Sequence, residues 1–473
     1  MRLSLDDTII APATVPGSGA IALIRVSGPK AFEFTDAVVR FRKGNAASSE
    51  GYSIHFGTVF TQNGRELDDV LVSIFRAPHS YTGEDCTEIS CHASRYITGE
   101  IIRLFIDAGA RYAEPGEFTR RAFTAGKMDL AQAEAVADLI AAGTEAAHRA
   151  AFMQLRGGFS SELRQMRSEL VELVSLLELE LDFSEEDVEF ADRGRLNALL
   201  DSLRAHVAGL TDSFRLGNAI RNGVPAAIVG AANTGKSTLL NALIGEDRAI
   251  VSDIAGTTRD TVEDTVNIGG VLFRFIDTAG IRDTSDVIEK LGIERTFKRI
   301  SEAEIILAVL DADSDEHRIS EECREVLRHV SLPSQKLVFL LNKADIADKN
   351  RYNKNVIAIN KIVLSIENQI KVFTISAKTG QGLPELKKHL SDMESQLISD
   401  TDATFVTNFR HYQALGAAAL SLDEAAAALA SGEPTDLVAE LLRAALSHLG
   451  SITGDITTDE ILETIFSKFC VGK

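Results

Sequence analysis

A phosphate-binding loop in the middle of the chain constrains the fold more than any other feature. The loop reads Gly230-Ala231-Ala232-Asn233-Thr234-Gly235-Lys236-Ser237 and fits the pattern G-x-x-x-x-G-K-[ST]. An apolar run at 225–229 precedes it and a helical pattern at 238–244 follows, which is the setting the motif requires. Backbone N–H groups of such a loop surround phosphate, and its lysine and serine meet phosphate oxygens and Mg²⁺. The pattern by itself also fits a tight turn before a helix.

A second motif favours the nucleotide interpretation. Asp277-Thr278-Ala279-Gly280 follows an apolar run at 271–276. An acidic residue at a strand end, before a turn of small residues, can hold the Mg²⁺ shell and sense a γ-phosphate. We therefore expect the nucleotide to contact Asp277 and Gly280, and with them Asn233, Thr234, Gly235, Lys236, Ser237 and Thr238 of the loop.

Two further motifs indicate the base. Asn342-Lys343-Ala344-Asp345 follows an apolar run at 336–341, and Ser376-Ala377-Lys378 follows another at 372–375. The carboxylate of Asp345 can accept hydrogen bonds from the guanine N1–H and 2-amino groups, a donor pair that adenine lacks. The sequence therefore predicts GTP rather than ATP, with Ser376, Ala377 and Lys378 closing the base pocket. Four motifs in this order, each at a predicted strand end, are typical of a GTPase.

Composition limits the class of protein. The 473 residues suggest about three domains. The net charge is −20 with no basic domain or stripe, so an RNA partner would need a local patch or a partner protein. No apolar run approaches the roughly 20 residues of a membrane helix, and no signal peptide is recognisable, so we expect a cytoplasmic protein without integral membrane association. Four cysteines without a C-x-x-C pair indicate neither a disulfide framework nor zinc.

The predicted secondary structure changes along the chain. Residues 1–125 read as mixed α/β, and the segment after them as long helices at 128–142, 159–181 and 197–215. A strand-rich segment follows and contains a hairpin at 262–276, after which helical patterns return. The simplest account is one helical domain split by an inserted domain, with two separate helical domains as the alternative. The predicted boundaries are 1–125, 126–216, 217–392 and 393–473.

The combined motifs resemble the tRNA uridine-modification GTPases of the MnmE/TrmE family, and the match spans nearly the whole chain. The residues that carry this resemblance are Gly256-Thr257-Thr258-Arg259-Asp260, Pro78-His79-Ser80-Tyr81-Thr82-Gly83-Glu84-Asp85, Glu114-Pro115-Gly116-Glu117-Phe118-Thr119-Arg120-Arg121-Ala122-Phe123, Lys127-Met128-Asp129-Leu130 and the tail Phe466-Ser467-Lys468-Phe469-Cys470-Val471-Gly472-Lys473. The tail is the most specific, because other phosphate-loop GTPases lack it.

The resemblance implies a multidomain α/β and α protein. Its parts would be an N-terminal α+β folate-binding domain, an α-helical domain, and an inserted Ras-like GTPase domain with a doubly wound sheet. It also implies a homodimer formed through the N-terminal domain, and a flavoprotein partner (MnmG/GidA). Together these would add an aminomethyl-type or carboxymethylaminomethyl group at C5 of the wobble uridine of certain tRNAs, from a methylene-tetrahydrofolate-type donor.

The hydrolytic residue is not the usual one. Ras-like switches place a glutamine after the D-x-x-G motif to orient the attacking water. Ile281 stands there and cannot do so. The resemblance assigns the role to a glutamate of the following helix, which Glu289 matches. A solvated helix residue is the alternative interpretation of Glu289.

The resemblance also implies K⁺ in place of an arginine finger, with GTPase domains dimerising across the cation. Asn233 and the loop before the G-T-T-R-D motif would hold it, which gives Asn233, Ser252, Ile254 and Thr257 as expected ligands. Mg²⁺ would be held by Ser237 and Thr258. The switch would comprise Gly256, Thr257, Thr258, Arg259, Asp260 and Arg282, with the two arginines as conformational contacts or, alternatively, solvated surface residues.

The folate site is expected in the N-terminal part. Carboxylates suit the guanidine-like edge of a pterin, and basic residues suit a glutamate tail, so we expect Arg25, Glu84, Arg120 and Lys127 there, with Arg121 as an alternative for the tail. Purely structural roles remain the alternative. The resemblance makes Cys470 a candidate nucleophile or ordering element near that site. Thr457 and Glu460 fit a helix N-cap with a capping box just before the tail.

Two other functions stay open at this stage. A GTP-gated ribosome-assembly factor would share the GTPase segment but perform no group transfer. A folate-dependent one-carbon protein could use GTP only as a regulator. The lack of a basic RNA-binding module and the presence of the N-terminal and tail motifs speak against the first of these.

Overall fold

A computed structural model describes residues 7–15, 17, 19–182, 193–245, 264–276, 300–332, 334–364, 366, 370–394 and 405–472. Contacts divide the chain into two compact units. The first comprises Met1–Ala137, Gln154–Leu170 and Leu446–Lys473, and the second comprises Asp138–Met153 and Val171–Ala445. Each unit is described by itself.

A seven-stranded sheet forms most of the first unit. Its order is β3-β4-β5-β6-β2-β1-β7, antiparallel except for the β1–β7 pair. Residues alternate between buried and exposed along β5, where Val70, Val72 and Ile74 are buried, and this period of two is that of a sheet with one covered face. The strands are β1 (Ile9–Pro12), β2 (Ile21–Ser27), β3 (Val39–Phe41), β4 (Ser53–Phe60), β5 (Glu66–Phe75), β6 (Cys86–His92) and β7 (Arg111–Tyr112).

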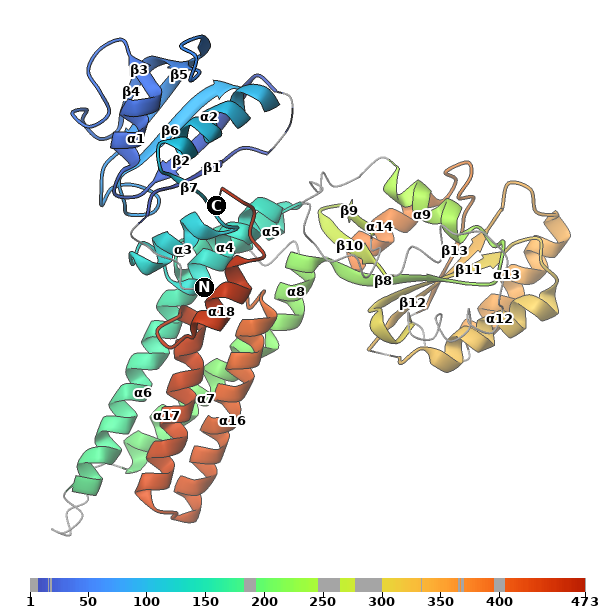
Figure 1. The fold of residues 1–473 in the computed structure, drawn as a ribbon. Helices are drawn as coiled ribbons and strands as arrows, with labels where there is room; N and C mark the ends of the chain where they lie inside the picture. Colours follow the sequence, from blue (N-terminus) through green and yellow to red (C-terminus); the bar gives the residue numbers. More distant parts are fainter. Residues whose placement is uncertain are drawn as a thin grey trace. The chain divides into compact units, whose positions relative to one another are not determined.

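Helices α1 (Ala31–Val38) and α2 (Arg95–Asp107) pack on the sheet (Figure 1). They contribute Phe34 and Phe105 to a core shared with the buried strand residues. The unit continues with α3 (Glu117–Thr124) and the start of α4 (Leu130–Ala141). The mixed α/β prediction for this part is therefore confirmed at the level of its elements.

The C-terminal helix α18 (Asp459–Phe466) belongs to the same unit. Phe466 and Phe469 join Leu130 and Ala133 in one apolar cluster. The N-cap of α18 is Thr458, whose side chain accepts the N–H of Ile461. The predicted cap at Thr457 is thus wrong by one residue. The capping box fails with it, because Glu460 comes one position too early to reach the cap N–H.

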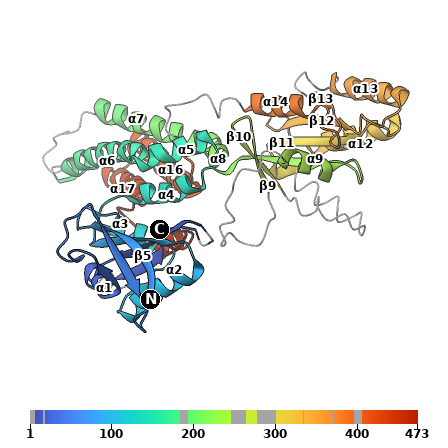
Figure 2. The ribbon, with the colours of Figure 1, turned by 90° about the horizontal axis from the view of Figure 1, so that it is seen from above.

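Long helices make up one part of the second unit. They are α7 (Arg193–Asp212), α8 (Phe214–Asn222), α16 (Phe409–Ser431) and most of α5 (Glu145–Leu155). Helices α6 (Gly158–Asp182) and α17 (Thr435–Thr453) belong to both units, which divide them at Leu170 and Ala445. Helices α7 and α16 lie side by side (Figure 2). The single helix predicted at 197–215 is wrong, because α7 ends at Asp212 and α8 begins after Ser213.

Within the described residues, α16 has the length and apolar composition that a membrane-crossing helix would need. Alanine dominates it, and it packs along α7 with Leu415, Ala418 and Leu422 buried. A core helix of a folded domain passes the same test, so this is weak evidence for a membrane span.

The two connections to the inserted segment lie against each other. The N–H of Val406 donates to Ser213 Oγ at 3.1 Å, and the rings of Phe214 and Tyr412 stack at 4.3 Å. A Cβ at Gly217 would come within 2.3 Å of the Val406 carbonyl oxygen, so only glycine allows this approach. Adjacent entry and exit points are what an insertion requires.

The inserted segment is a doubly wound α/β fold. Its sheet has the order β13-β12-β11-β8-β10-β9, parallel except for the β9–β10 hairpin, which confirms the predicted hairpin over its described residues. The strands are β8 (Val224–Val229), β9 (Asp264–Ile268), β10 (Val271–Phe275), β11 (Ile305–Asp311), β12 (Lys336–Asn342) and β13 (Lys371–Thr374).

Helices cover both faces of this sheet, which is why its central strands are continuous apolar runs. Helices α9 (Lys236–Ile244) and α14 (Leu383–Met393) pack on one face, and α12 (Glu316–His329) and α13 (Lys349–Leu364) on the other (Figure 1). The carboxyl ends of β8, β11, β12 and β13 meet at one edge. Ligands of open α/β sheets bind there.

Candidate functional site

The phosphate loop connects β8 to α9 and depends on its two glycines. Gly230 has φ 147° and Gly235 has φ 96°. A Cβ at Gly230 would come within 2.2 Å of the Val309 carbonyl oxygen, and one at Gly235 within 2.3 Å of Asn342 Nδ2. The backbone therefore folds closely against β11 and β12, and side chains at these two positions would force the loop away from them.

The remaining loop residues lie at the start of α9. Lys236 Nζ donates to the carbonyl oxygens of Gly230 and Ala231, at 2.9 and 2.6 Å, which holds the ammonium against the loop. Ser237 is half-buried in the first turn, where its hydroxyl is suited to a Mg²⁺ shell. Asn233 is exposed with φ 63°, and Thr238 is exposed.

One side chain connects three of the sequence motifs. Asn342, at the end of β12, is buried, and its Nδ2 donates to the Thr234 carbonyl oxygen at 2.8 Å. Its Oδ1 accepts the N–H of Ala377 at 2.9 Å. The phosphate loop, the N-K-A-D turn and the S-A-K loop are therefore held together by one amide, whose two ends serve two different loops.

Lys343 is fixed by a residue that the sequence reasoning missed. Its backbone has φ 66°, and its Nζ lies 2.6 Å from Oδ2 of Asp311, the last residue of β11. The missed signal was a carboxylate directly after the apolar run 305–310, the same arrangement that singled out Asp277. The ion pair fixes the Lys343 side chain at the edge of the sheet where the nucleotide is expected to bind.

The base-contacting candidates differ in exposure. Ser376 and Ala377 are buried, while Asp345 and Lys378 are exposed. The S-A-K loop is closed by hydrogen bonds from the Ser376 N–H to the Gln381 carbonyl and from the Thr379 N–H to Ser376 Oγ. Together, this closed loop and the exposed carboxylate of Asp345 can form a flat pocket for a base.

Several predicted residues lie outside the described part of the chain. They are Asp277, Gly280 and Glu289, the expected cation ligands Ser252, Ile254, Thr257 and Thr258, and the switch residues Gly256, Arg259, Asp260 and Arg282. Their predicted roles stay predictions.

In the first unit, the candidate folate residues surround the loop 78–85. Arg25 pairs with Glu88 at 2.8 Å and lies over the rings of Tyr81 and Phe118, 4.9 and 5.6 Å from the centroids. Glu84 accepts from Ser27 Oγ at 2.7 Å. The Arg25 guanidinium and the Glu84 carboxylate thus lie near the same loop, but each already has a protein partner.

Arg121, not Arg120, engages the Glu84 carboxylate. Its guanidinium is buried and contacts Glu84 at 3.1 Å, Asp7 at 2.5 Å and Glu117 at 3.0 Å. Arg111 binds Asp7 and Glu117 as well. Burial raises the pKa values of Asp7 and Glu117, but the hydrogen bonds from Arg111 and Arg121 outweigh it and leave both pKa values lowered. The network therefore stays ionised at neutral pH.

Arg120 and Lys127 are the more accessible cations. Arg120 is half-buried and has no ion pair among the described residues. Lys127 is exposed, and its Nζ donates to the Pro78 carbonyl at 2.9 Å, which brings it to the same loop as Glu84. Their charges remain available to an anionic ligand.

The C-terminal tail packs on this part of the unit. The Gly116 N–H donates to the Cys470 carbonyl at 3.3 Å, and a Cβ at Gly472 would come within 2.1 Å of the Pro12 carbonyl oxygen. Cys470 is exposed. Burial raises the pKa values of Cys86 and Cys323 to about 12 and that of Cys91 to about 11, so these thiols are poor nucleophiles.

The phosphate loop lies at the edge of a doubly wound sheet where the carboxyl ends of its parallel strands meet. Asn342 joins this loop to a guanine-type motif, and the combination defines a phosphate-loop GTPase. The flanking segments match two family models, "GTP-binding protein TrmE N-terminus" over residues 8–127 and "MnmE helical domain" over residues 130–470. The chain belongs to the MnmE family of tRNA modification GTPases.

Relatives of full length agree with this assignment. A tRNA modification GTPase MnmE of Bacteroides thetaiotaomicron is 47% identical and covers 99% of this chain and 100% of its own. One from Cytophaga hutchinsonii is 46% identical, with 99% and 98% covered. The chain is thus a GTP-hydrolysing enzyme that acts in tRNA modification.

Among solved structures, a GTP-binding protein of Sulfolobus solfataricus in complex with GDP is 21% identical. It matches 49% of this chain and 67% of its own with a TM-score of 0.28. The G domain of the T. maritima FeoB iron transporter is 25% identical, with 36% and 97% covered and a TM-score of 0.24. At such scores the likeness carries no inference about function.

Proposed function

We propose that this enzyme, with a flavoprotein partner, installs an aminomethyl-type or carboxymethylaminomethyl group at C5 of the wobble uridine of certain tRNAs, using a tetrahydrofolate-bound one-carbon unit. The family assignment over the full chain supports this proposal. The observation that carries it is the cluster of Glu84, Arg25 and Lys127 around one loop, because it brings a carboxylate, a guanidinium and an exposed ammonium group together for a pterin and its acidic tail.

Mass spectrometry of wobble uridines in a deletion strain tests the function. Loss of the C5 modification with normal ribosome profiles supports it. Retained modification with defective ribosome profiles would instead favour the ribosome-assembly alternative. Retained modification with altered folate pools would favour a one-carbon protein that uses GTP as a regulator.

We propose Mg²⁺ ligation by Ser237 and Thr258, and water activation by Glu289. The half-buried position of Ser237 in the first turn of α9 supports the first role. Bound Mg²⁺ would neutralise charge on the β- and γ-phosphates. Glu289→Ala is expected to abolish GTP turnover and leave nucleotide affinity nearly unchanged. Near-normal turnover of that variant would remove Glu289 from the mechanism.

We propose K⁺ as the cation that replaces an arginine finger. The exposed position of Asn233 in the phosphate loop supports this role, with Ser252, Ile254 and Thr257 as the other proposed ligands. Stimulation by K⁺ but not by Na⁺, lost in Asn233→Ala, is the expected result. Equal rates in both salts would contradict it. Pairing of two GTPase domains across the cation is part of this proposal.

We propose that the tail orders the folate site. The Cys470 carbonyl accepts from Gly116, which is the N-cap of α3, the helix that bears Arg120 and Arg121. Cys470→Ser tests the thiol as a nucleophile, and deletion of the last residues tests ordering. If both variants modify tRNA normally, neither role holds.

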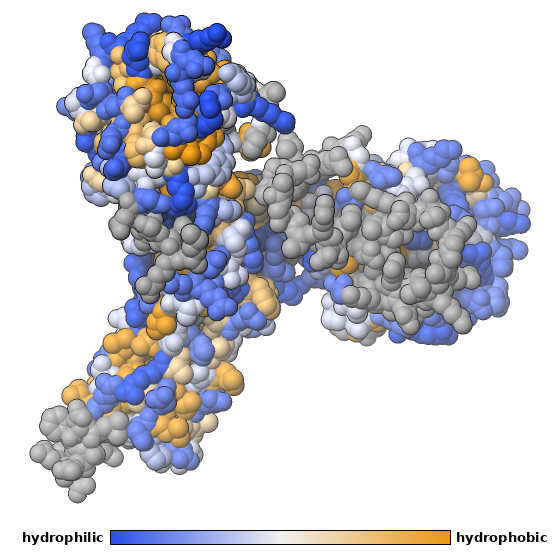
Figure 3. All heavy atoms as spheres, viewed as in Figure 1, coloured by the Kyte–Doolittle hydropathy of each residue, from blue (hydrophilic) through white to orange (hydrophobic). Residues whose placement is uncertain are grey.

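We propose a homodimer formed through the N-terminal sheet. The uncovered sheet face exposes Ile21, Ile54 and Leu71, with exposed fractions of 69%, 67% and 47%. Apolar side chains gather on this part of the molecule (Figure 3). Light scattering of an Ile54→Lys/Leu71→Lys variant would show a monomer if this face makes the dimer. We also propose a cytoplasmic location for the enzyme. The proposed domain boundaries are 1–125, 126–216, 217–392 and 393–473.

A further inference from the structure

The edge of the inserted sheet at β13 collects positive charge in a chain of net charge −20. Residues 334–394 hold ten Lys and Arg against six Asp and Glu, so this segment is basic. Strand β13 is the outermost strand of the sheet, with α13 on one face and α14 on the other. The sequence-wide average concealed this local reversal of charge.

Helix α13 carries the clearest part of the pattern. It contains four basic residues and no acidic one. Asn355, Ala358, Ile359 and Val363 form its buried face. The exposed residues are basic residues, asparagines and two apolar residues, namely Lys349, Asn350, Arg351, Asn353, Lys354, Ile357, Asn360, Lys361 and Leu364.

These lysines have no carboxylate partners. Lys349, Lys354 and Lys361 are exposed and form no ion pair with any residue the structure describes. In contrast, Arg351 on the same helix pairs with Asp313, and Lys336 at the start of β12 pairs with Glu394. An acidic protein has enough carboxylates to neutralise its surface cations, so a row left unneutralised favours an anionic partner.

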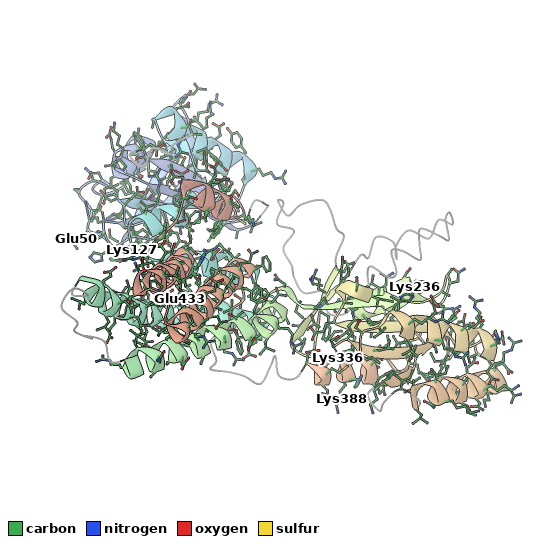
Figure 4. The ribbon with its side chains drawn as sticks, turned by 90° about the horizontal axis from the view of Figure 1, so that it is seen from below. Glu50, Lys127, Lys236, Lys336, Lys388 and Glu433 are labelled. Carbon is green, nitrogen blue, oxygen red and sulfur yellow. The ribbon has the colours of Figure 1, made fainter. Side chains whose placement is uncertain are left out.

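Two more exposed cations lie on β13, which α13 covers on one face, and on α14, which covers the other face. Lys371 on β13 and Lys388 on α14 are exposed and likewise have no ion pair among the described residues. Burial and the nearby charge of Lys371 lower the pKa of His389, which places Lys371 next to α14. Figure 4 labels Lys388 and Lys236, which lie on different sides of the inserted segment in that view.

An alternative explanation for a lysine on an edge strand is that it prevents pairing with a strand of another molecule. That reason applies to Lys371 but not to Lys354 and Lys361, which lie on a helix. These two are seven residues apart, which places them on one face about 10 Å from each other. Exposed asparagines beside lysines are the side chains that hydrogen-bond to phosphate and sugar.

We propose that this surface, defined by Lys354 and Lys361 of α13 and Lys371 of the adjacent strand β13, binds the sugar–phosphate backbone of the tRNA substrate. The inference rests on the proposed function, since it takes tRNA as the substrate. Phosphate contacts of this kind position an RNA without reading its sequence. The rest of the chain is acidic and repels the polyanion, so the contact has to be local.

The test compares two double charge reversals in the full-length protein. Lys354→Glu/Lys361→Glu alters the surface. Lys43→Glu/Arg65→Glu makes the same change of net charge at exposed positions of the first unit that also lack ion pairs among the described residues. Binding of an unmodified tRNA transcript is measured by fluorescence anisotropy over a range of salt concentrations, and GTP turnover is measured in parallel.

The expected result is at least a tenfold loss of tRNA affinity in the α13 variant. The slope of log affinity against log salt should fall by about two, one for each phosphate contact removed. Lys354→Arg/Lys361→Arg should bind normally, and the control reversal should lose much less. Unchanged GTP turnover shows that the fold and the GTPase site are intact, which separates failure of this proposal from failure of the proposed function.

Equal losses in the two reversals would overturn the proposal, because net charge alone would then explain them. Unchanged tRNA binding would also overturn it. If the variant bound tRNA normally but no longer bound an acidic protein, the surface would be a protein-docking site. Should the reversal impair GTP turnover, Lys354→Gln/Lys361→Gln decides the question by the same criteria.

Discussion

Asn342 donates a 2.8 Å hydrogen bond from its side-chain amide to the carbonyl oxygen of Thr234. The two residues are far apart in the sequence and belong to the guanine motif and the phosphate loop. Because the same amide also accepts from Ala377, movement of the phosphate loop is transmitted to both loops around the base. Recognition of the base and of the phosphates is therefore one structural unit.

Asn342→Ala should weaken GTP binding about 30-fold. The variant loses two buried hydrogen bonds worth about 1 kcal/mol each, and both loops become free to move. Titration calorimetry with GTP and GDP measures the change. Asn360→Ala, at an exposed position of α13, is the matched control and should bind normally. Equal affinities of the two variants would contradict the structural role of Asn342.

Gly235→Ala should destabilise the phosphate loop and abolish tight GTP binding. The new Cβ would lie 2.3 Å from Asn342 Nδ2. The alanine would also have to adopt φ 96°, a backbone conformation that costs about 1–3 kcal/mol for a residue other than glycine. Gly416→Ala in α16 has nothing within 4 Å of the Cβ and should stabilise that helix by about 0.5–1 kcal/mol. Nucleotide titration and thermal unfolding of both variants check this contrast.

Asp345→Asn should reduce GTP affinity at least 100-fold and create affinity for xanthosine triphosphate. The amide cannot accept both guanine donors, and each charge-assisted hydrogen bond is worth about 1.5–3 kcal/mol. The amide can instead donate to the 2-oxo group of xanthine. Asp392→Asn, an exposed site on α14, controls for loss of charge. Competition binding with the two nucleotides would reveal an unchanged preference if the assignment is wrong.

The Asp7–Glu117–Arg121 network predicts acid sensitivity of the first unit. The folded-state pKa values of Asp7 and Glu117 lie below their usual values of 3.8 and 4.5. Their contribution to stability is therefore complete above about pH 4.5 and disappears as the pH falls through the folded pKa values. Calorimetric melting of the full chain between pH 7 and pH 3 should show this loss.

Glu117→Gln should remove part of that pH dependence and cost about 3 kcal/mol at neutral pH, because it leaves a buried guanidinium less well neutralised. Glu100→Gln breaks the more exposed pair with Arg103 and should cost much less, because solvent screens that pair. Identical melting profiles for the two variants would show that the buried network does not stabilise the fold.

The nucleotide motifs were predictable because each depends on local chemistry. A glycine-rich turn between a strand and a helix, or a polar residue after an apolar run, can be recognised without knowing what lies beside it. The predicted strands ending at Val229, Leu341 and Ile375 correspond to β8, β12 and β13 within about one residue. Helix ends were less predictable, as the separation of α7 from α8 at Ser213 shows, because packing against Val406 accompanies that break.

Local patterns predicted that a GTPase segment interrupts a helical region, and that Glu84, Arg25 and Lys127 lie near a folate, which stays a prediction. Only the tertiary structure decided that Arg121 holds Glu84, that Asp311 fixes Lys343, and that the lysines of α13 have no ion pair among the described residues. These facts depend on which strands are neighbours in a sheet and which side of a helix is buried. Sequence periodicity describes one element at a time, whereas ion pairs and charged surfaces form between elements that are distant along the chain.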